Sequence, residues 1–251
     1  MEQPTGFVTP GKENQVCRLK KSLYGLKQSS RVWNRKFSDF LTQYGFSQCF
    51  TDPCVFFLNE EVDYTVMAIW VDDGIICSSN PDKLQNILNY LDKQFEMTSG
   101  SVQCFVGIQI KRDRKNKVIH LSQGPYIERV LNKFKMSTCH PRGVPADPHS
   151  RLSKALDLSE QEFPYREAIG SLIFAASCTR PDIAYAVNQA SQHCSNPSRS
   201  HWEAVKRIVR YLRGSTNFGI GFGSTHQQLV VYSDSDYAGD LDDRSSTTGA
   251  I

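Results

Sequence analysis

The stretch that decides the fold runs from Val66 to Cys77 and reads Val-Met-Ala-Ile-Trp-Val-Asp-Asp-Gly-Ile-Ile-Cys. Two apolar runs rich in β-branched residues flank Asp73 and Gly74, and Asp-Gly between such runs is a strong signal of a β-hairpin. Glycine accepts the positive φ angle that a tight primed turn requires, so we expect the turn to use Gly74. The turn accounts for Asp73 and Gly74, but it leaves the second carboxylate, Asp72, without a structural reason.

Asp72 and Asp73 are therefore a candidate metal platform. Two neighbouring carboxylates repel each other unless a cation lies between them, and carboxylate oxygens are the ligands that hard divalent ions prefer. Paired acids also occur at hairpin tips as plain solvated turn residues. The spacing alone leaves both interpretations open.

The segments around this hairpin predict an α+β fold. Apolar residues with helical spacing lie on one face of an expected helix that ends at Gly45, namely Trp33, Phe37, Phe40, Leu41 and Tyr44. We interpret this aromatic stripe as core. Three strands are expected over 54–58, 64–71 and 75–78, and Asn80 then caps a helix whose first residue is Pro81. This order indicates an antiparallel sheet with helices on one face.

The second half of the chain predicts two further strands, four helices and two last strands. The strands are expected over 105–110 and 118–121, where Gly107 indicates a bulge or a close approach of another group. The helices are expected over 125–135, 164–177, 181–192 and 200–213, and the last strands over 218–222 and 229–235. Ser200 with Glu203, and Thr179 with Asp182, have the spacing of capping boxes.

Composition bounds the class of protein. With 251 residues, 39% of them hydrophobic, the chain can form one large or two ordinary domains. We find no run long enough for a membrane span and no signal peptide, so we expect a soluble protein of the cytoplasm, with the nucleus as the alternative. The eight cysteines occur singly and are expected to be reduced.

The net charge is only +3, but six cations occur without an acid between Lys20 and Lys36. Such a face suits phosphate or is simply solvated.

Eight sequence blocks, in order, resemble the reverse transcriptase of copia-type LTR retrotransposons running into ribonuclease H. They are 21–28 with Arg31 and Trp33, 70–73, 105–108, 121–123 with Tyr126, 165–166 with 170–172, 179–182, His201 with 210–212, and 232–240 with 243–245. The resemblance implies a partial palm with primer-grip hairpin over 1–121, a helical thumb and connection over 122–215, and the first strands of a truncated ribonuclease H domain over 216–251. It also implies virus-like particles for the intact element.

The resemblance gives candidate residues their roles. It implies that Asp72 and Asp73 bind Mg²⁺ or Mn²⁺ in the palm, and that Asp234 is the first metal-binding carboxylate of ribonuclease H. It implies contacts with template and nucleotide for Gly25, Lys27, Gln28 and Arg31, and a primer grip formed by Phe105, Val106, Gly107 and Ile108. The implied partners are an RNA or DNA template with primer and deoxynucleoside triphosphates, and no membrane. Trp70 replaces the usual Tyr, and Ser29-Ser30 the usual Ala-Pro.

The two implied active sites are expected to be incomplete. The palm needs a third carboxylate, which the family places upstream of Met1, and Asp39, Asp52 and Asp63 are poor substitutes. Ribonuclease H needs about four carboxylates, of which only Asp234 is matched. We therefore expect a reverse transcriptase segment that is inactive alone. The alternatives are a nucleic-acid-binding remnant and a host-retained interaction protein.

Two smaller candidate sites have simpler explanations. The acids between 234 and 243 resemble an EF-hand calcium loop, but Ala238 and Ser245 occupy positions where ligands are needed. His201 lies where a helix is expected to begin, and we interpret it as a helix-start residue and not as a ligand. Arg210 and Arg213 are expected to face solvent, while Arg31 and Arg35 are the better phosphate candidates.

Overall fold

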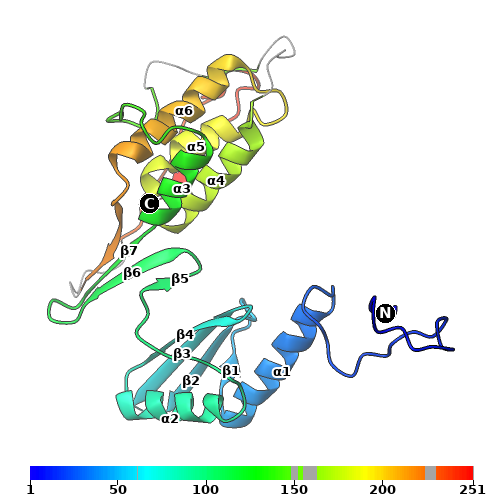
Figure 1. Ribbon diagram of the computed structural model, residues 1–251. Coiled ribbons are helices and arrows are strands. Elements are labelled where there is room, and N and C mark those ends of the chain that lie inside the picture. Colours follow the sequence, from blue (N-terminus) through cyan, green and yellow to red (C-terminus); the bar gives the residue numbers. More distant parts are fainter. Residues whose placement is uncertain (61, 148–151, 155–162, 224–229, 251) are drawn as a thin grey trace. The chain divides into compact units, whose positions relative to one another are not determined.

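The computed structural model describes residues 1–60, 62–147, 152–154, 163–223 and 230–250 (Figure 1). The chain forms two compact units, Met1–Ser101 and Val102–Ile251. This boundary differs from the predicted one at residue 121. The reason is that the segment after Val102 pairs with strands later in the chain, as shown below, so the expected primer-grip hairpin belongs to the second unit.

The first unit is an antiparallel sheet with two helices. Its elements are α1 (Ser29–Tyr44), β1 (Ser47–Gln48), β2 (Val55–Glu60), β3 (Asp63–Trp70), β4 (Asp73–Ser78) and α2 (Pro81–Asp92). The strands lie in the order β1-β2-β3-β4, and each pairs with its neighbour in the antiparallel sense. The predicted three-strand meander is confirmed. The short strand β1, which we did not predict, adds a fourth strand at the β2 edge of the sheet.

The core of this unit lies between the two helices and one face of the sheet. The buried side chains come from α1 (Phe37, Leu41), α2 (Ile87, Leu91) and the strands (Phe56, Leu58, Met67). Trp33, Phe40 and Tyr44 pack against this cluster. The prediction that the aromatic stripe is core is confirmed. The predicted cap is also confirmed, because Asn80 Oδ1 accepts hydrogen bonds from the backbone N–H groups of Asp82 (3.0 Å) and Lys83 (3.2 Å).

The helices of the second unit surround a single core. They are α3 (Gly124–Lys133), α4 (Tyr165–Cys178), the 3₁₀-helix η1 (Pro181–Ile183), α5 (Ala184–Ser191) and α6 (Arg199–Gly214). Buried residues from all of them form one cluster. Among the described residues, no helix combines the length and the apolar character that a membrane span requires.

The predicted capping boxes of this unit are wrong. Ser198, and not Ser200, caps α6, and its capping box is completed by His201, whose Nδ1 accepts from the Ser198 N–H at 2.9 Å. His201 is thus a helix-start residue, as predicted. Thr179 is the C-cap of α4, and the residue before η1 is Arg180. The Thr179 hydroxyl makes no N-terminal cap and donates instead to Gln123 Oε1 at 2.8 Å in the interior. Helix ends depend on backbone geometry, which sequence spacing specifies only to within a few residues.

Two small antiparallel sheets complete the second unit. The first contains β5 (Cys104–Phe105), β6 (Ile108–Asp113), β7 (Val118–Ser122) and β8 (Gly219–Phe222), in that order. The second pairs β9 (Ser233–Ser235) with β10 (Thr248–Ala250). We expected β8 to be the first strand of the ribonuclease H segment. In the structure it pairs with β7 of the β6–β7 hairpin. The strand predicted over 229–235 is shorter in the structure, and its residue 229 lies outside the described residues.

Candidate functional site

The two candidate metal ligands lie at the tip of the β3–β4 hairpin. Trp70 pairs with Asp73, so Val71 and Asp72 are the two residues of the turn. Asp72 therefore lies in the turn, Asp73 begins β4, and both side chains are exposed. Both carboxylates are accessible to a cation or a ligand from solvent.

The predicted conformation of this turn is wrong. Gly74 lies inside β4, where it pairs with Ile69, and the positive φ angle (55°) belongs to Val71. A β-carbon at position 74 would lie 3.4 Å from Met67 Cε, so glycine at this position leaves room for a buried side chain of β3. A β-branched residue at positive φ is a strained conformation that surrounding contacts must hold in place.

Trp33 supplies one of these contacts. Its indole Nε1–H donates to the backbone carbonyl of Val71 at 2.7 Å. The same ring packs against Phe37 and Phe95, with centroid distances of 5.6 and 5.5 Å. Helix α1 thereby connects the core of the first unit to the turn that carries Asp72. No sequence pattern pointed to this bond, since Trp33 and Val71 are 38 residues apart.

The described residues bring no third metal ligand to the turn. No group of three or more His, Cys, Asp or Glu side chains among them could hold a metal ion. The carboxylate of Asp63 accepts from Asn80 Nδ2 (2.9 Å) and Ser79 Oγ (3.2 Å), and that of Asp52 accepts from the Cys54 N–H (2.8 Å). These acids serve the backbone and the helix cap. The chemistry of Asp72 and Asp73 fits Mg²⁺, but it provides only part of a two-metal site.

Asp234 lies in β9, opposite Gly249 of β10, and its side chain is exposed. The acids that follow it use their oxygens locally. Asp240 Oδ1 accepts from the N–H groups of Asp242 (2.7 Å) and Asp243 (3.1 Å), and Asp236 Oδ1 accepts from the Thr247 N–H. The acids of this loop therefore stabilise its backbone, and the described part of the chain gives the calcium interpretation no support.

The expected template loop and primer grip each contain a turn that needs positive φ. Gly25 has φ 89° and lies two residues before the exposed Lys27, which is followed by Gln28, the exposed N-cap residue of α1. The expected strand over 105–110 is two strands, because Phe105 pairs with Ile108 around a two-residue turn. Its residues Val106 (φ 49°) and Gly107 (φ 78°) both have the positive angles of a type I′ turn. Gly107 thus makes a turn, and the predicted bulge is wrong.

Another sequence block forms a buried polar network that we did not predict. The Arg180 side chain is fully buried and donates to both oxygens of Asp182 (2.9 and 2.7 Å) and to the carbonyl and hydroxyl of Ser215 (2.8 and 2.6 Å). Tyr211 donates its hydroxyl to the same carboxylate at 2.8 Å. Desolvation alone would raise the pKa of Asp182, but the hydrogen bonds from Arg180 and Tyr211 outweigh it and lower the pKa. These hydrogen bonds connect η1 to α6 and to the residue that follows α6.

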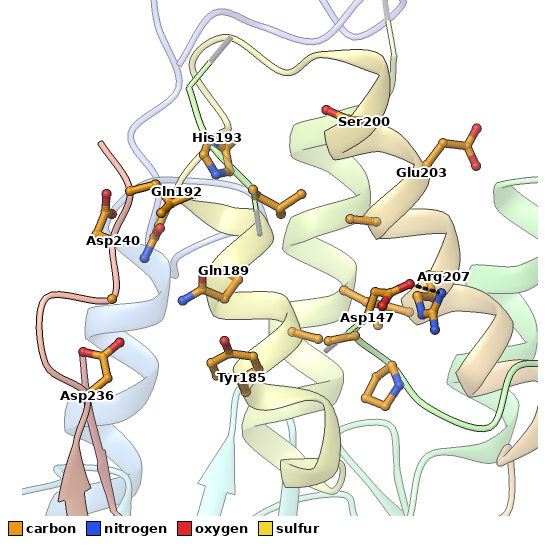
Figure 2. A pocket seen from close by; sticks show the side chains of 18 of the residues that line it. Asp147, Tyr185, Gln189, Gln192, His193, Ser200, Glu203, Arg207, Asp236 and Asp240 are labelled. Carbon is orange, nitrogen blue, oxygen red and sulfur yellow. Dashed lines mark hydrogen bonds and ion pairs between the residues drawn. The ribbon is translucent and has the colours of Figure 1, made fainter. Parts of the chain in front are cut away.

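A pocket of about 850 Å³ lies in the second unit between α5, α6 and the loop 236–242 (Figure 2). Tyr185 and Gln189 of α5 line it together with Asp236 and Asp240 of the loop. On the α6 side Arg207 pairs with Asp147 at 3.1 Å. The lining mixes both signs of charge, and its described residues include no nucleophile and base that hydrogen-bond to each other.

Comparison with known proteins decides the family. The family model "Reverse transcriptase (RNA-dependent DNA polymerase)" matches residues 1–148. The chain belongs to the copia-type reverse transcriptase family. The retrovirus-related Pol polyprotein from transposon TNT 1-94 of Nicotiana tabacum is 42% identical over 260 residues, covering 100% of this chain and 20% of the relative. That from transposon RE1 of Arabidopsis thaliana is 40% identical over 259 residues, covering 100% of this chain and 17% of the relative.

A more distant relative is the transposon Ty1-DR1 Gag-Pol polyprotein of Saccharomyces cerevisiae, 26% identical over 221 residues that cover 80% of this chain and 12% of the relative. The chain spans a fifth or less of the length of these copia-type relatives. No solved structure matches it. Membership of the copia-type reverse transcriptase family was the prediction drawn from the eight blocks, and it is confirmed.

Proposed function

We propose that this chain contributes two metal-binding carboxylates and a primer-template-binding surface to a copia-type RNA-directed DNA polymerase. The observation that carries the proposal is the tip of the β3–β4 hairpin, where Asp72 of the turn and Asp73 of β4 are adjacent and Trp33 holds the strained residue Val71. A strained turn retained at a functional tip is typical of sites that need a fixed geometry.

The chemistry of the reaction gives each part a task. Magnesium ions, when bound, lower the charge on the triphosphate and orient the attacking primer hydroxyl. In this proposal Asp72 and Asp73 hold the ions. Lys27, exposed in the loop before α1, and Arg31, exposed in its first turn, bind backbone phosphates near Gly25, whose open surroundings allow close approach. The turn of Val106 and Gly107 positions the primer strand.

We further propose that these 251 residues alone do not polymerise, because two carboxylates are fewer than a two-metal centre needs. Primer extension on poly(rA) with an oligo(dT) primer and Mg²⁺ or Mn²⁺ tests this directly. We expect no templated product. A product that is lost in Asp72→Asn, but retained in the matched surface variant Asp39→Asn, would refute the inactivity.

Metal binding has a readout that is independent of activity. Trp70 lies directly before the turn, so Mn²⁺ held by Asp72 and Asp73 should broaden the ¹⁹F signal of 5-fluorotryptophan at position 70. We expect this broadening in the parent chain and its loss in Asp72→Asn/Asp73→Asn. Equal broadening in both proteins would refute the metal-binding role of the pair.

A second candidate function is binding of nucleic acid without catalysis. It is supported by six exposed cations without an intervening acid, Lys20, Lys21, Lys27, Arg31, Arg35 and Lys36. Binding dominated by phosphate contacts weakens steeply with salt. We therefore expect the affinity for an RNA–DNA hybrid to fall between about 50 and 200 mM salt. An affinity that does not change over this range would contradict the proposal.

For Asp234 we propose a ribonuclease H role that these residues alone do not complete, so no RNA cleavage is expected.

A further inference from the structure

The β6–β7 hairpin of the second unit ends in a cluster of cations. Five exposed basic residues form this basic tip: Lys111, Arg112, Arg114, Lys115 and Lys117. We propose that the basic tip binds the phosphate backbone of an RNA–DNA hybrid. The inference rests on the nucleic-acid binding proposed above and adds to it a contact surface at the end of the hairpin opposite Val106 and Gly107.

The geometry of the hairpin presents these cations to solvent. Lys111 pairs with His120, Arg112 with Ile119 and Asp113 with Val118, so the strands remain paired up to the tip. In Figure 1 the hairpin extends away from the helices of its own unit. A paired, twisted ribbon is stiffer than an open loop, and it keeps the charges close together at little further cost in conformational entropy.

The single acid of the tip does not neutralise these cations by pairing with them. Asp113 Oδ1 accepts from the Asn116 N–H at 3.0 Å, and Oδ2 accepts from Asn116 Nδ2 at 2.7 Å. These bonds, the backbone one foremost, lower the pKa of Asp113, and the carboxylate shapes the turn. Within the described part of the chain, the five cations form no ion pair, whereas Lys133 pairs with Glu167 at 2.7 Å.

Among the described residues, the third strand places little side-chain bulk on one face beside the tip. Gly221 of β8 lies opposite His120, and a β-carbon at this glycine would meet no atom within 4 Å. Lys111, His120 and Gly221 lie in one row across the three strands, and in the described part of the chain no side chain covers this row at Gly221. A nucleic-acid backbone can approach such a surface closely, and its phosphates would then lie within reach of the lysines.

The other cluster of cations in this unit is a poorer phosphate site. Arg142, Arg207 and Arg210 line the pocket of Figure 2. Five acids line the same pocket: Asp147, Glu203, Asp236, Asp240 and Asp242. One of these acids already pairs with Arg207. A polyanion would meet more negative than positive charge there, whereas the basic tip offers five cations to one acid.

The test compares two variants with the same change of charge. Arg112→Gln/Arg114→Gln/Lys115→Gln removes three cations from the tip. The control Arg129→Gln/Lys135→Gln/Arg199→Gln removes three exposed cations elsewhere in the same unit. Fluorescence anisotropy with a labelled 20-base-pair RNA–DNA hybrid gives the affinity at several salt concentrations, and circular dichroism verifies that each variant is folded.

We expect the tip variant to bind at least about tenfold more weakly at 100 mM salt, with a salt slope reduced by about 2 to 3, because each lost phosphate contact lowers the slope by about 0.9. The control should change the affinity by less than about threefold. If the tip variant binds as tightly as the parent chain, or if both variants bind equally more weakly, the proposed phosphate contact of the basic tip is wrong. If the parent chain shows no salt-dependent binding, both the proposed contact at the basic tip and the proposed nucleic-acid binding are wrong.

Discussion

Replacement of Arg180 by methionine should destabilise the second unit strongly. The guanidinium is completely buried and makes four hydrogen bonds, two to the carboxylate of Asp182 and two to Ser215. It also lies over the rings of Tyr211 (5.5 Å) and Phe218 (5.6 Å). Methionine fills much of the same space but can donate none of these bonds.

The magnitude follows from what the substitution leaves behind. Removing one partner of a buried ion pair costs about 3 to 5 kcal/mol, because the other charge loses its compensation. The Asp182 side chain is 33% exposed and keeps the hydroxyl of Tyr211, so water and Tyr211 offset part of this cost. We therefore expect a loss near the lower end, about 3 kcal/mol of unfolding free energy.

Urea denaturation provides the assay. Of the three tryptophans, only Trp202 belongs to the second unit, so the ¹⁹F signal of 5-fluorotryptophan at this position follows the unfolding of that unit. With an m-value of about 2 kcal/mol/M, the midpoint should fall by about 1.5 M. The matched control is Arg166→Met, which removes an exposed arginine with one hydrogen bond to the Cys194 carbonyl, and it should cost less than about 1 kcal/mol.

A second variant separates the charge from the space it occupies. Arg180→Met/Asp182→Leu removes both ions, and it should be more stable than Arg180→Met because no unpaired carboxylate remains. If Arg180→Met costs no more than Arg166→Met, the buried network does not stabilise the helices. If the double variant is the less stable of the two, the explanation by an uncompensated charge is wrong.

The remaining predictions concern backbone approach and pH. Gly219→Ala should lower the unfolding free energy by about 1 to 3 kcal/mol, because its β-carbon would lie 2.0 Å from the Leu121 carbonyl oxygen. Gly221→Ala should lower it by under about 1 kcal/mol, because a β-carbon there meets no atom within 4 Å. Equal thermal stability of the two variants would contradict this. Burial lowers the pKa of His193 and His201, whose rings stack 4.0 Å apart, below the ordinary 6.5. As the pH falls, the unfolded state therefore takes up protons before the folded state does. The full unfolding free energy is present above about pH 7, and it should decline as the pH falls through 6.5 and below. The decline should be at most about 1.4 kcal/mol per pH unit for each histidine. Unfolding free energies measured from pH 8 to 5 check this, and His193→Gln should reduce the decline.

The sequence by itself determined the features that depend on neighbours along the chain. Apolar spacing predicted the helices, and the apolar runs around Asp72 predicted the hairpin. Asn80 was correctly assigned as a helix cap because its partners are only two and three residues away. The order of the eight blocks identified the family without any tertiary information.

Only the tertiary structure decided the features that depend on distant contacts. The hairpin turn falls on Val71 and Asp72 because strand register, the bulk of Met67 beside Gly74 and the bond from Trp33 act together. Strand β8 joins the β6–β7 hairpin across about a hundred residues, a pairing that no local pattern encodes.

The roles of single charged residues also depended on the fold. The sequence does not show that Arg180 is buried; it is buried because Asp182 and Ser215 satisfy its guanidinium in the interior. The accessibility of the basic tip, and the lack of ion pairs between it and the described residues, became evident only from the paired hairpin that carries it. Burial and pairing are properties of three-dimensional surroundings, and residue type alone does not specify them.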